Sequence, residues 1–128
     1  FQKHGLCYAA SGADYEAAAV TYFKATLNVA ATNQLATEQL NTWAAEAQQA
    51  PSLAAINKLY PKRVQVLCSA VDGKNQLSAI RSCYAKMAAE GTVGPFTPID
   101  CAAAAKTSAM VPCPASGPIT LLPYKAPM

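Results

Sequence analysis

Histidine is almost absent from this sequence: His4 is the only one among 128 residues. Hydrolytic catalysis usually relies on a histidine base, and the residues around His4 include no recognisable orienting acid. The interpretation is therefore a solvated side chain near a terminus. The six glycines are scattered and form no phosphate-binding loop. We therefore expect no enzyme and no cofactor, and a cysteine nucleophile paired with His4 is the remaining enzymatic alternative.

Long apolar runs and strong charge are also missing. No stretch approaches the ~20 apolar residues that cross a bilayer, so no transmembrane segment is expected. The net charge is only +3, and the one basic cluster, Lys58, Lys62 and Arg63, is shorter than the basic stripe that typically contacts nucleic acid. The composition therefore predicts no nucleic-acid partner. The first residue is Phe1, which is typical of a processed chain or of a fragment.

The five cysteines contain no C-x-x-C pair, which argues against a thioredoxin-type site and against a structural zinc site. No metal is therefore expected. Widely spaced cysteines are typical of a disulfide framework in an oxidising compartment, so the protein is predicted to be secreted, extracellular or periplasmic. The alternative is a cytosolic chain with five reduced thiols. The disulfide candidates are Cys7, Cys68, Cys83, Cys101 and Cys113.

An odd number of cysteines leaves one thiol over. Cys68 and Cys83 are expected on neighbouring antiparallel helices at levels that differ by roughly 6 Å, which is unfavourable for a mutual bridge. Cys7 and Cys113 lie in segments with little regular structure, which a bridge would anchor. We therefore predict that Cys7 and Cys113 are both bridged, and that Cys68, Cys83 or Cys101 is the unpaired thiol. Such a thiol also allows a disulfide-linked dimer.

Alanine dominates the composition, with 28 residues against 24 for Val, Ile, Leu and Phe together. Alanine favours helix because it loses no side-chain entropy there. The sequence predicts an all-α fold: a disulfide-stapled bundle of five to six short helices over residues 1–111. Five prolines after residue 111 predict an extended, proline-rich tail over 112–128, packed on the bundle or projecting from it.

Capping residues and apolar periodicity suggest where each helix begins. The first three helices are expected from Ser11–Asp14 to about Ala31, from Thr37 to Pro51, and from Ser52 onward. Pro61 and Asn75 are expected to start the fourth and fifth helices, with Gly91 ending the fifth. Thr97 is expected to cap the sixth helix, which reaches Met110. Val64 and Val66 alternate as in a strand, but no partner strand is evident, so helix is preferred there.

Aromatic side chains at helical spacing either fill the core or line a ligand cavity between helices. The function predicted from the sequence is a secreted, non-enzymatic binding protein that carries a small hydrophobic ligand, such as a lipid or sterol. The alternative is an extracellular surface or matrix protein that binds a protein partner through its tail or an exposed helix face. The candidate ligand-binding residues are Tyr15, Tyr22, Phe23, Trp43, Tyr84 and Met87.

Overall fold

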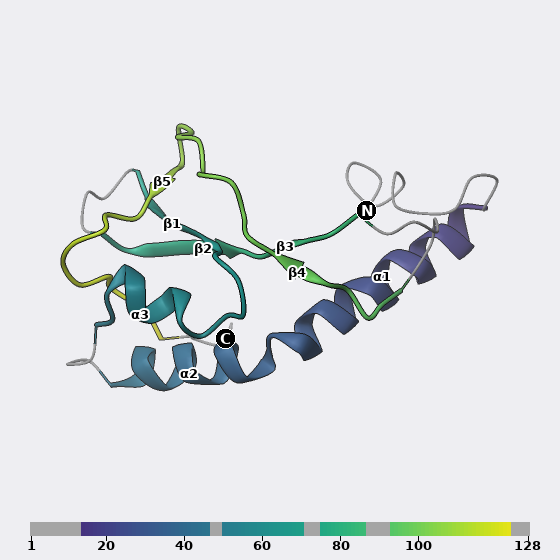
Figure 1. Ribbon diagram of the computed structural model, residues 1–128, viewed down its shortest axis with the longest axis horizontal. Coiled ribbons are helices and arrows are strands. Elements are labelled where there is room, and N and C mark those ends of the chain that lie inside the picture. The colour runs from purple at the N-terminus through teal and green to yellow at the C-terminus, as the bar shows by residue number, and fades with distance from the viewer. Residues whose placement is uncertain (1–13, 47–49, 71–74, 87–92, 124–128) are drawn as a thin grey trace, which may run out of the picture. The chain divides into compact units, whose positions relative to one another are not determined.

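The computed structural model describes residues 14–46, 50–70, 75–86 and 93–123, and in them it has both helices and strands (Figure 1). The helices are α1 Tyr15–Thr32, α2 Gln34–Ala45 and α3 Leu53–Asn57. The strands are β1 Gln65–Ser69, β2 Leu77–Arg81, β3 Cys83–Tyr84, β4 Pro98–Ile99 and β5 Met110–Pro112. The predicted all-α bundle is therefore wrong, and the fold is α+β.

The chain forms two compact units. The first, called the helical unit here, comprises 1–34 and 84–97, and the second, called the sheet unit, comprises 35–83 and 98–128. The division predicted from the sequence at residues 111 and 112 is a different one and stays a prediction. Within the predicted tail, Pro112 belongs to β5, and Ile119 is fully buried in the core of the sheet unit.

Helix α1 carries most of the described helical unit. Asp14 caps it, accepting a hydrogen bond from the backbone N–H of Ala17 at 2.7 Å, which satisfies one of the unpaired donors of the first turn. The helix ends at Thr32, and Asn33 caps its end, with its N–H donating to the carbonyl of Val29. The predicted first helix is confirmed over these residues. Asp14, which was expected in the first turn, is instead the cap, and Ser11, the expected cap, lies outside the described residues.

Small and polar side chains hold the helical unit together. The buried residues of α1 are Ala18 and Ala25. The side-chain amide of Asn28 donates to the carbonyl of Val93, and that of Asn33 donates to the Tyr84 hydroxyl at 2.9 Å. These contacts join the helix to the segment 84–97 with little apolar burial.

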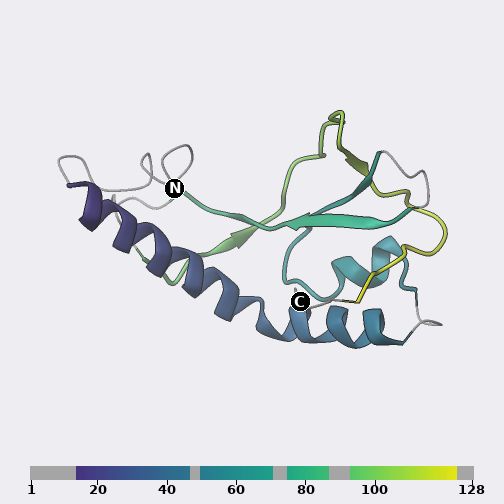
Figure 2. The ribbon, with the colours of Figure 1, turned by 180° about the vertical axis from the view of Figure 1, so that it is seen from behind.

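The sheet unit is built on a three-stranded antiparallel sheet in the order β2-β1-β5. The central strand β1 pairs with β2 from Gln65 opposite Arg81 to Cys68 opposite Leu77, with an irregularity between Leu67 and Cys68. Helices α3 and α2 lie on one side of this sheet (Figures 1 and 2). The buried core comprises Ile56, Val64, Val66, Cys68, Cys113 and Ile119, with Leu40 and Trp43 of α2 packed against it.

The predicted fourth and fifth helices are replaced by β1, β2 and β3. Val64 and Val66 are both buried against the core, so their alternation was the correct signal, and β-branched residues favour a strand of this kind. Short helices are marginal unless tertiary packing supports them, whereas β1 has partners on both edges. One of these partners, β5, lies more than 40 residues further along the chain.

The predicted sixth helix is absent from the described residues, although four alanines follow Cys101. The carbonyl of Cys101 accepts from the Arg63 guanidinium, from Nε at 3.1 Å and Nη2 at 2.9 Å. The carbonyl of Ala102 accepts from the Gln65 side chain at 2.9 Å. These side chains take carbonyl groups that a helix would use internally, so the alanine run stays non-helical.

The other predicted helices are confirmed with changed bounds. Helix α2 begins at Gln34 and ends at Ala45, so Thr37 lies inside the helix and is no cap. Helix α3 has the predicted cap, since the Ser52 hydroxyl accepts from the N–H of Ala55 at 3.2 Å. Gly91 lies outside the described residues.

Two disulfides cross-link the sheet unit. Cys68 of β1 is bonded to Cys113, with 4.9 Å between the Cα atoms, and Cys83 is bonded to Cys101, with 5.3 Å. The prediction that Cys113 is bridged is confirmed, and Cys68 and Cys83 indeed do not bond each other. The prediction that the odd thiol is Cys68, Cys83 or Cys101 is wrong, because β pairing brings each of them beside a partner. Cys7 lies outside the described residues.

Candidate functional site

The surface of α1 is the first candidate, because it exposes aromatic side chains. Tyr15 and Phe23 are 55% and 54% exposed, whereas Tyr22 is half-buried and contacts Phe23 edge to face, with 5.5 Å between ring centroids. These residues were predicted to face a core or a ligand cavity. On α1 the buried positions are instead the alanines Ala18 and Ala25.

The other predicted ligand-binding residues have separate roles. Tyr84, in the helical unit, is half-buried, with its hydroxyl held by Asn33 and its ring edge-to-face with Phe96. Trp43 belongs to the sheet unit and packs against that unit's core. Met87 lies outside the described residues. None of the predicted six lines the pocket that is the second candidate.

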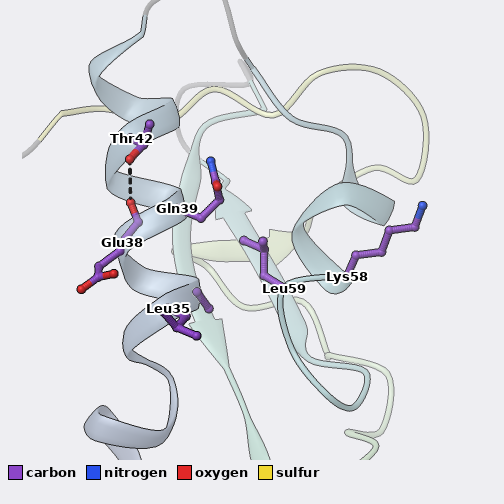
Figure 3. A pocket seen from close by; sticks show the side chains of 7 residues that line it. Leu35, Glu38, Gln39, Thr42, Lys58 and Leu59 are labelled. Atoms are coloured by element: carbon purple, nitrogen blue, oxygen red, sulfur yellow. Dashed lines mark hydrogen bonds between the residues drawn. The ribbon is translucent and has the colours of Figure 1, made fainter.

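That pocket lies in the sheet unit, between α2 and the residues that follow α3 (Figure 3). Its volume is about 550 Å³. Leu59 points toward α2, and the Gln39 amide extends toward the end of that helix that carries Thr42 (Figure 3). The Glu38 and Lys58 side chains point outward on opposite sides (Figure 3). The Thr42 hydroxyl donates to the backbone carbonyl of Glu38 at 3.0 Å. The lining residues are Leu35, Ala36, Glu38, Gln39, Thr42, Lys58 and Leu59.

One wall of the pocket continues into the loop 58–63, which is fixed at both ends. At its base the Asn57 side chain accepts from the backbone N–H of Val64 at 3.0 Å. At its end the N–H of Arg63 donates to the Asp100 carboxylate at 2.7 Å, and the Arg63 guanidinium donates to the carbonyl of Cys101. Arg63 therefore holds the loop, while the lysines Lys58 and Lys62 are exposed.

The positive charge of the chain is concentrated in the sequence of the sheet unit. Residues 35–83 and 98–128 contain seven basic and four acidic residues, whereas 1–34 and 84–97 contain three of each. The net +3 of the chain therefore comes entirely from the sheet unit. A surplus of this sign favours anionic partners near that unit.

The described part of the chain has neither a metal-binding cluster nor a membrane-spanning helix. Residues 14–46, 50–70, 75–86 and 93–123 contain no group of three or more His, Cys, Asp or Glu residues that could hold a metal ion. Within the same ranges, no helix combines the length and the apolar character needed to span a bilayer.

Comparison with known proteins identifies the class of this one. Residues 1–101 match the Ribonuclease T2 family. The chain therefore belongs to the Ribonuclease T2 family, and this membership indicates an RNA-cleaving enzyme. No curated protein and no solved structure shows significant similarity to the chain.

Family membership corrects the function predicted from the sequence. The non-enzymatic carrier of a hydrophobic ligand is overturned, as are the alternative of a protein-binding surface or matrix factor and the exclusion of nucleic acid. His4 was discounted because no orienting acid adjoins it in the sequence, although catalytic groups that are distant in the sequence can meet in space. His4 lies outside the described residues.

Proposed function

We propose that this protein cleaves phosphodiester bonds of single-stranded RNA and that His4 transfers a proton in the reaction. The supporting observation is the family match over residues 1–101, which includes the only histidine of the sequence. Imidazole is the side chain best suited to accept and donate protons near neutral pH. Lys3, its neighbour, carries a positive charge suited to a phosphate.

The 2′-hydroxyl of RNA supplies the nucleophile in this proposal. A base removes its proton while the 2′-oxygen forms a bond to the adjacent phosphorus. The bond from phosphorus to the 5′-oxygen breaks, and an acid protonates the leaving oxygen. The products are a 2′,3′-cyclic phosphate and a free 5′-hydroxyl. His4 is proposed for one of these two proton transfers.

The aromatic residues of α1 are proposed to support substrate binding. Unpaired bases stack on exposed aromatic rings, which are sequence-tolerant platforms worth ~1–3 kcal/mol per base. Tyr15 and Phe23 each expose more than half of their surface, and α1 follows His4 closely in the sequence. These residues, first considered for a hydrophobic ligand, are thus reassigned to nucleobases.

We also infer that the protein folds in an oxidising compartment, by export or by entry into the secretory pathway. The two disulfides of the sheet unit support this inference, because such bonds persist where thiols are not kept reduced.

The test is His4→Ala, with Lys24→Gln as a control at an exposed position of α1. His4→Ala is expected to lower kcat for a dinucleotide by about 10²–10⁴-fold, the usual contribution of a positioned proton-transfer group. It is also expected to remove one limb of the pH–rate profile. Circular dichroism checks that both variants fold. Cleavage by His4→Ala at the wild-type rate, with an unchanged pH profile, contradicts the assignment.

A further inference from the structure

We propose that the pocket of the sheet unit is a subsite for one base of single-stranded RNA and that Lys58 and Lys62 contact the neighbouring phosphates. This inference rests on the proposed function, because it takes RNA as the substrate. It adds a binding site to which none of the residues proposed for proton transfer or base stacking belongs.

The pocket has the size and chemistry that a nucleobase requires. Its volume of about 550 Å³ is within the range of ~300–1,000 Å³ found for small-molecule sites. Leu35 and Leu59 supply apolar surface for the flat faces of a base. Gln39 also lines the pocket, with its amide extending toward the end of α2 that carries Thr42 (Figure 3), and this amide can both donate and accept, as pairing with the polar edge of a base requires.

The charges around the pocket indicate which side a phosphate backbone would follow. Lys58 lines the pocket on the α3 side, and Lys62 lies in the same loop, whose base is fixed by Asn57 and Val64. Glu38 lies on the opposite side and points away (Figure 3). Phosphates are therefore attracted to the lysine side and repelled from the glutamate side. An uncharged hydrophobic ligand would make no use of the lysine charges on one side of the pocket.

The rigidity of the loop strengthens the proposal. The backbone N–H of Arg63 donates to the Asp100 carboxylate, and its guanidinium donates to the carbonyl of Cys101. Cys101 is itself cross-linked to Cys83. The backbone beside Lys62 is thus held before a ligand arrives. A preformed site loses less conformational entropy on binding than a mobile one.

The experiment measures binding without cleavage. The probe is a 2′-O-methyl RNA oligonucleotide of about twelve nucleotides, within the range of site sizes found for single-strand-binding domains; its blocked 2′-oxygen prevents the proposed reaction. Fluorescence anisotropy gives its Kd at several salt concentrations. The variants are Gln39→Ala and Lys58→Gln. The matched control is Lys106→Gln, the same charge change at an exposed lysine of the same unit.

Lys106 is a suitable control because it lies before β5, whose Met110 pairs with Ser69 at the end of β1 remote from Arg63. Strand β1 has five residues, so at ~3.3 Å per strand residue its two ends are about 13 Å apart. Removing Lys106 changes the net charge as much as removing Lys58 does, without touching the pocket.

Gln39→Ala is expected to weaken binding by about fivefold, the effect of one typical hydrogen bond. Lys58→Gln is expected to make the dependence of the binding constant on salt less steep, lowering the magnitude of the slope of log K against log salt concentration by about 0.7. This is the contribution of one phosphate contact on single-stranded nucleic acid. Lys106→Gln is expected to stay close to wild type in both respects. Thermal melts check that all three variants fold.

The two proposals fail in different ways. Two outcomes overturn the subsite while the proposed function stands, and in both the wild type cleaves RNA. In the first, the probe has the same Kd for all three variants: Gln39→Ala, Lys58→Gln and Lys106→Gln. In the second, the wild type does not bind the probe. If the probe binds with the expected losses but the wild type cleaves no RNA, the subsite stands and the proposed function is overturned. An acidic peptide that binds with the same losses, while RNA does not, also overturns the subsite.

Discussion

The two units of this chain bury different kinds of side chain. In the sheet unit, Ile56, Leu67 and Ile119 are at most 1% exposed, and two disulfides cross-link the strands and their flanking residues. In the helical unit, the buried residues of α1 are alanines, and its large apolar side chains, such as Leu27 at 69% exposed, face outward. Among the described residues, the sheet unit thus has a conventional core, whereas the helical unit is held by a cap, small buried side chains, polar contacts and the ring contact between Tyr84 and Phe96.

This difference suggests that the sheet unit provides the stable scaffold and that the helical unit provides an exposed surface. A chain rich in alanine has few large side chains to bury, and here most of those that are fully buried belong to one unit. The helical unit leaves Tyr15, Phe23 and Leu27 exposed on one helix. The sheet unit also exposes large apolar residues, but Leu35, Ile99 and Leu122 lie apart in the sequence. Exposed aromatic and aliphatic residues on one helix are typical of an interaction surface.

Breaking the disulfides is expected to have the largest effect. Replacing Cys68 and Cys113 with alanine removes a cross-link between residues 45 positions apart. The chain-entropy relation predicts that the free energy of unfolding falls by roughly 4 kcal/mol. Replacing Cys83 and Cys101 opens an 18-residue separation and costs roughly 3 kcal/mol. Urea denaturation followed by circular dichroism measures both losses. A smaller loss for the Cys68–Cys113 pair than for the Cys83–Cys101 pair contradicts the entropic account.

Matched aliphatic truncations test the contrast between the units directly. Ile56→Ala removes a fully buried side chain and is expected to lower the free energy of unfolding by about 3 kcal/mol, through lost transfer energy and a new cavity. Leu27→Ala removes an exposed one and is expected to change it by less than about 0.5 kcal/mol. The same denaturation experiment measures both. Comparable losses would mean that Leu27 is covered in solution.

Gly94 tests the polar packing of the helical unit. Its φ is +122°, and an added Cβ would lie 3.2 Å from Nδ2 of Asn28, whose amide donates to the carbonyl of Val93. Gly94→Ala is therefore expected to cost about 2 kcal/mol through backbone strain and displacement of Asn28. Ala85→Gly, elsewhere in the segment, is the control. Amide hydrogen exchange should show weaker protection in α1 for Gly94→Ala only, and protection equal to the control would contradict this account.

The sequence by itself determined the features that depend on neighbouring residues. The start at residues 11–14 and the alanine-rich run that follows specify α1, although Asp14 and not the expected Ser11 is its observed cap. Ser52 specifies the start of α3. Both follow because helical hydrogen bonds and caps join residues three or four apart. The widely spaced cysteines likewise pointed to disulfides, two of which are present.

Only the tertiary structure decided what depends on distant partners. Strand β1 exists because Gln65 pairs with Arg81 and Cys68 pairs with Val111, and a single-sequence pattern does not reveal such pairings. The same pairings place the cysteines beside their partners. The pocket joins residues 35–42 to Lys58 and Leu59, which share no local motif. Local propensity acts over a helical turn, whereas strands, bridges and binding sites arise where segments far apart in sequence meet.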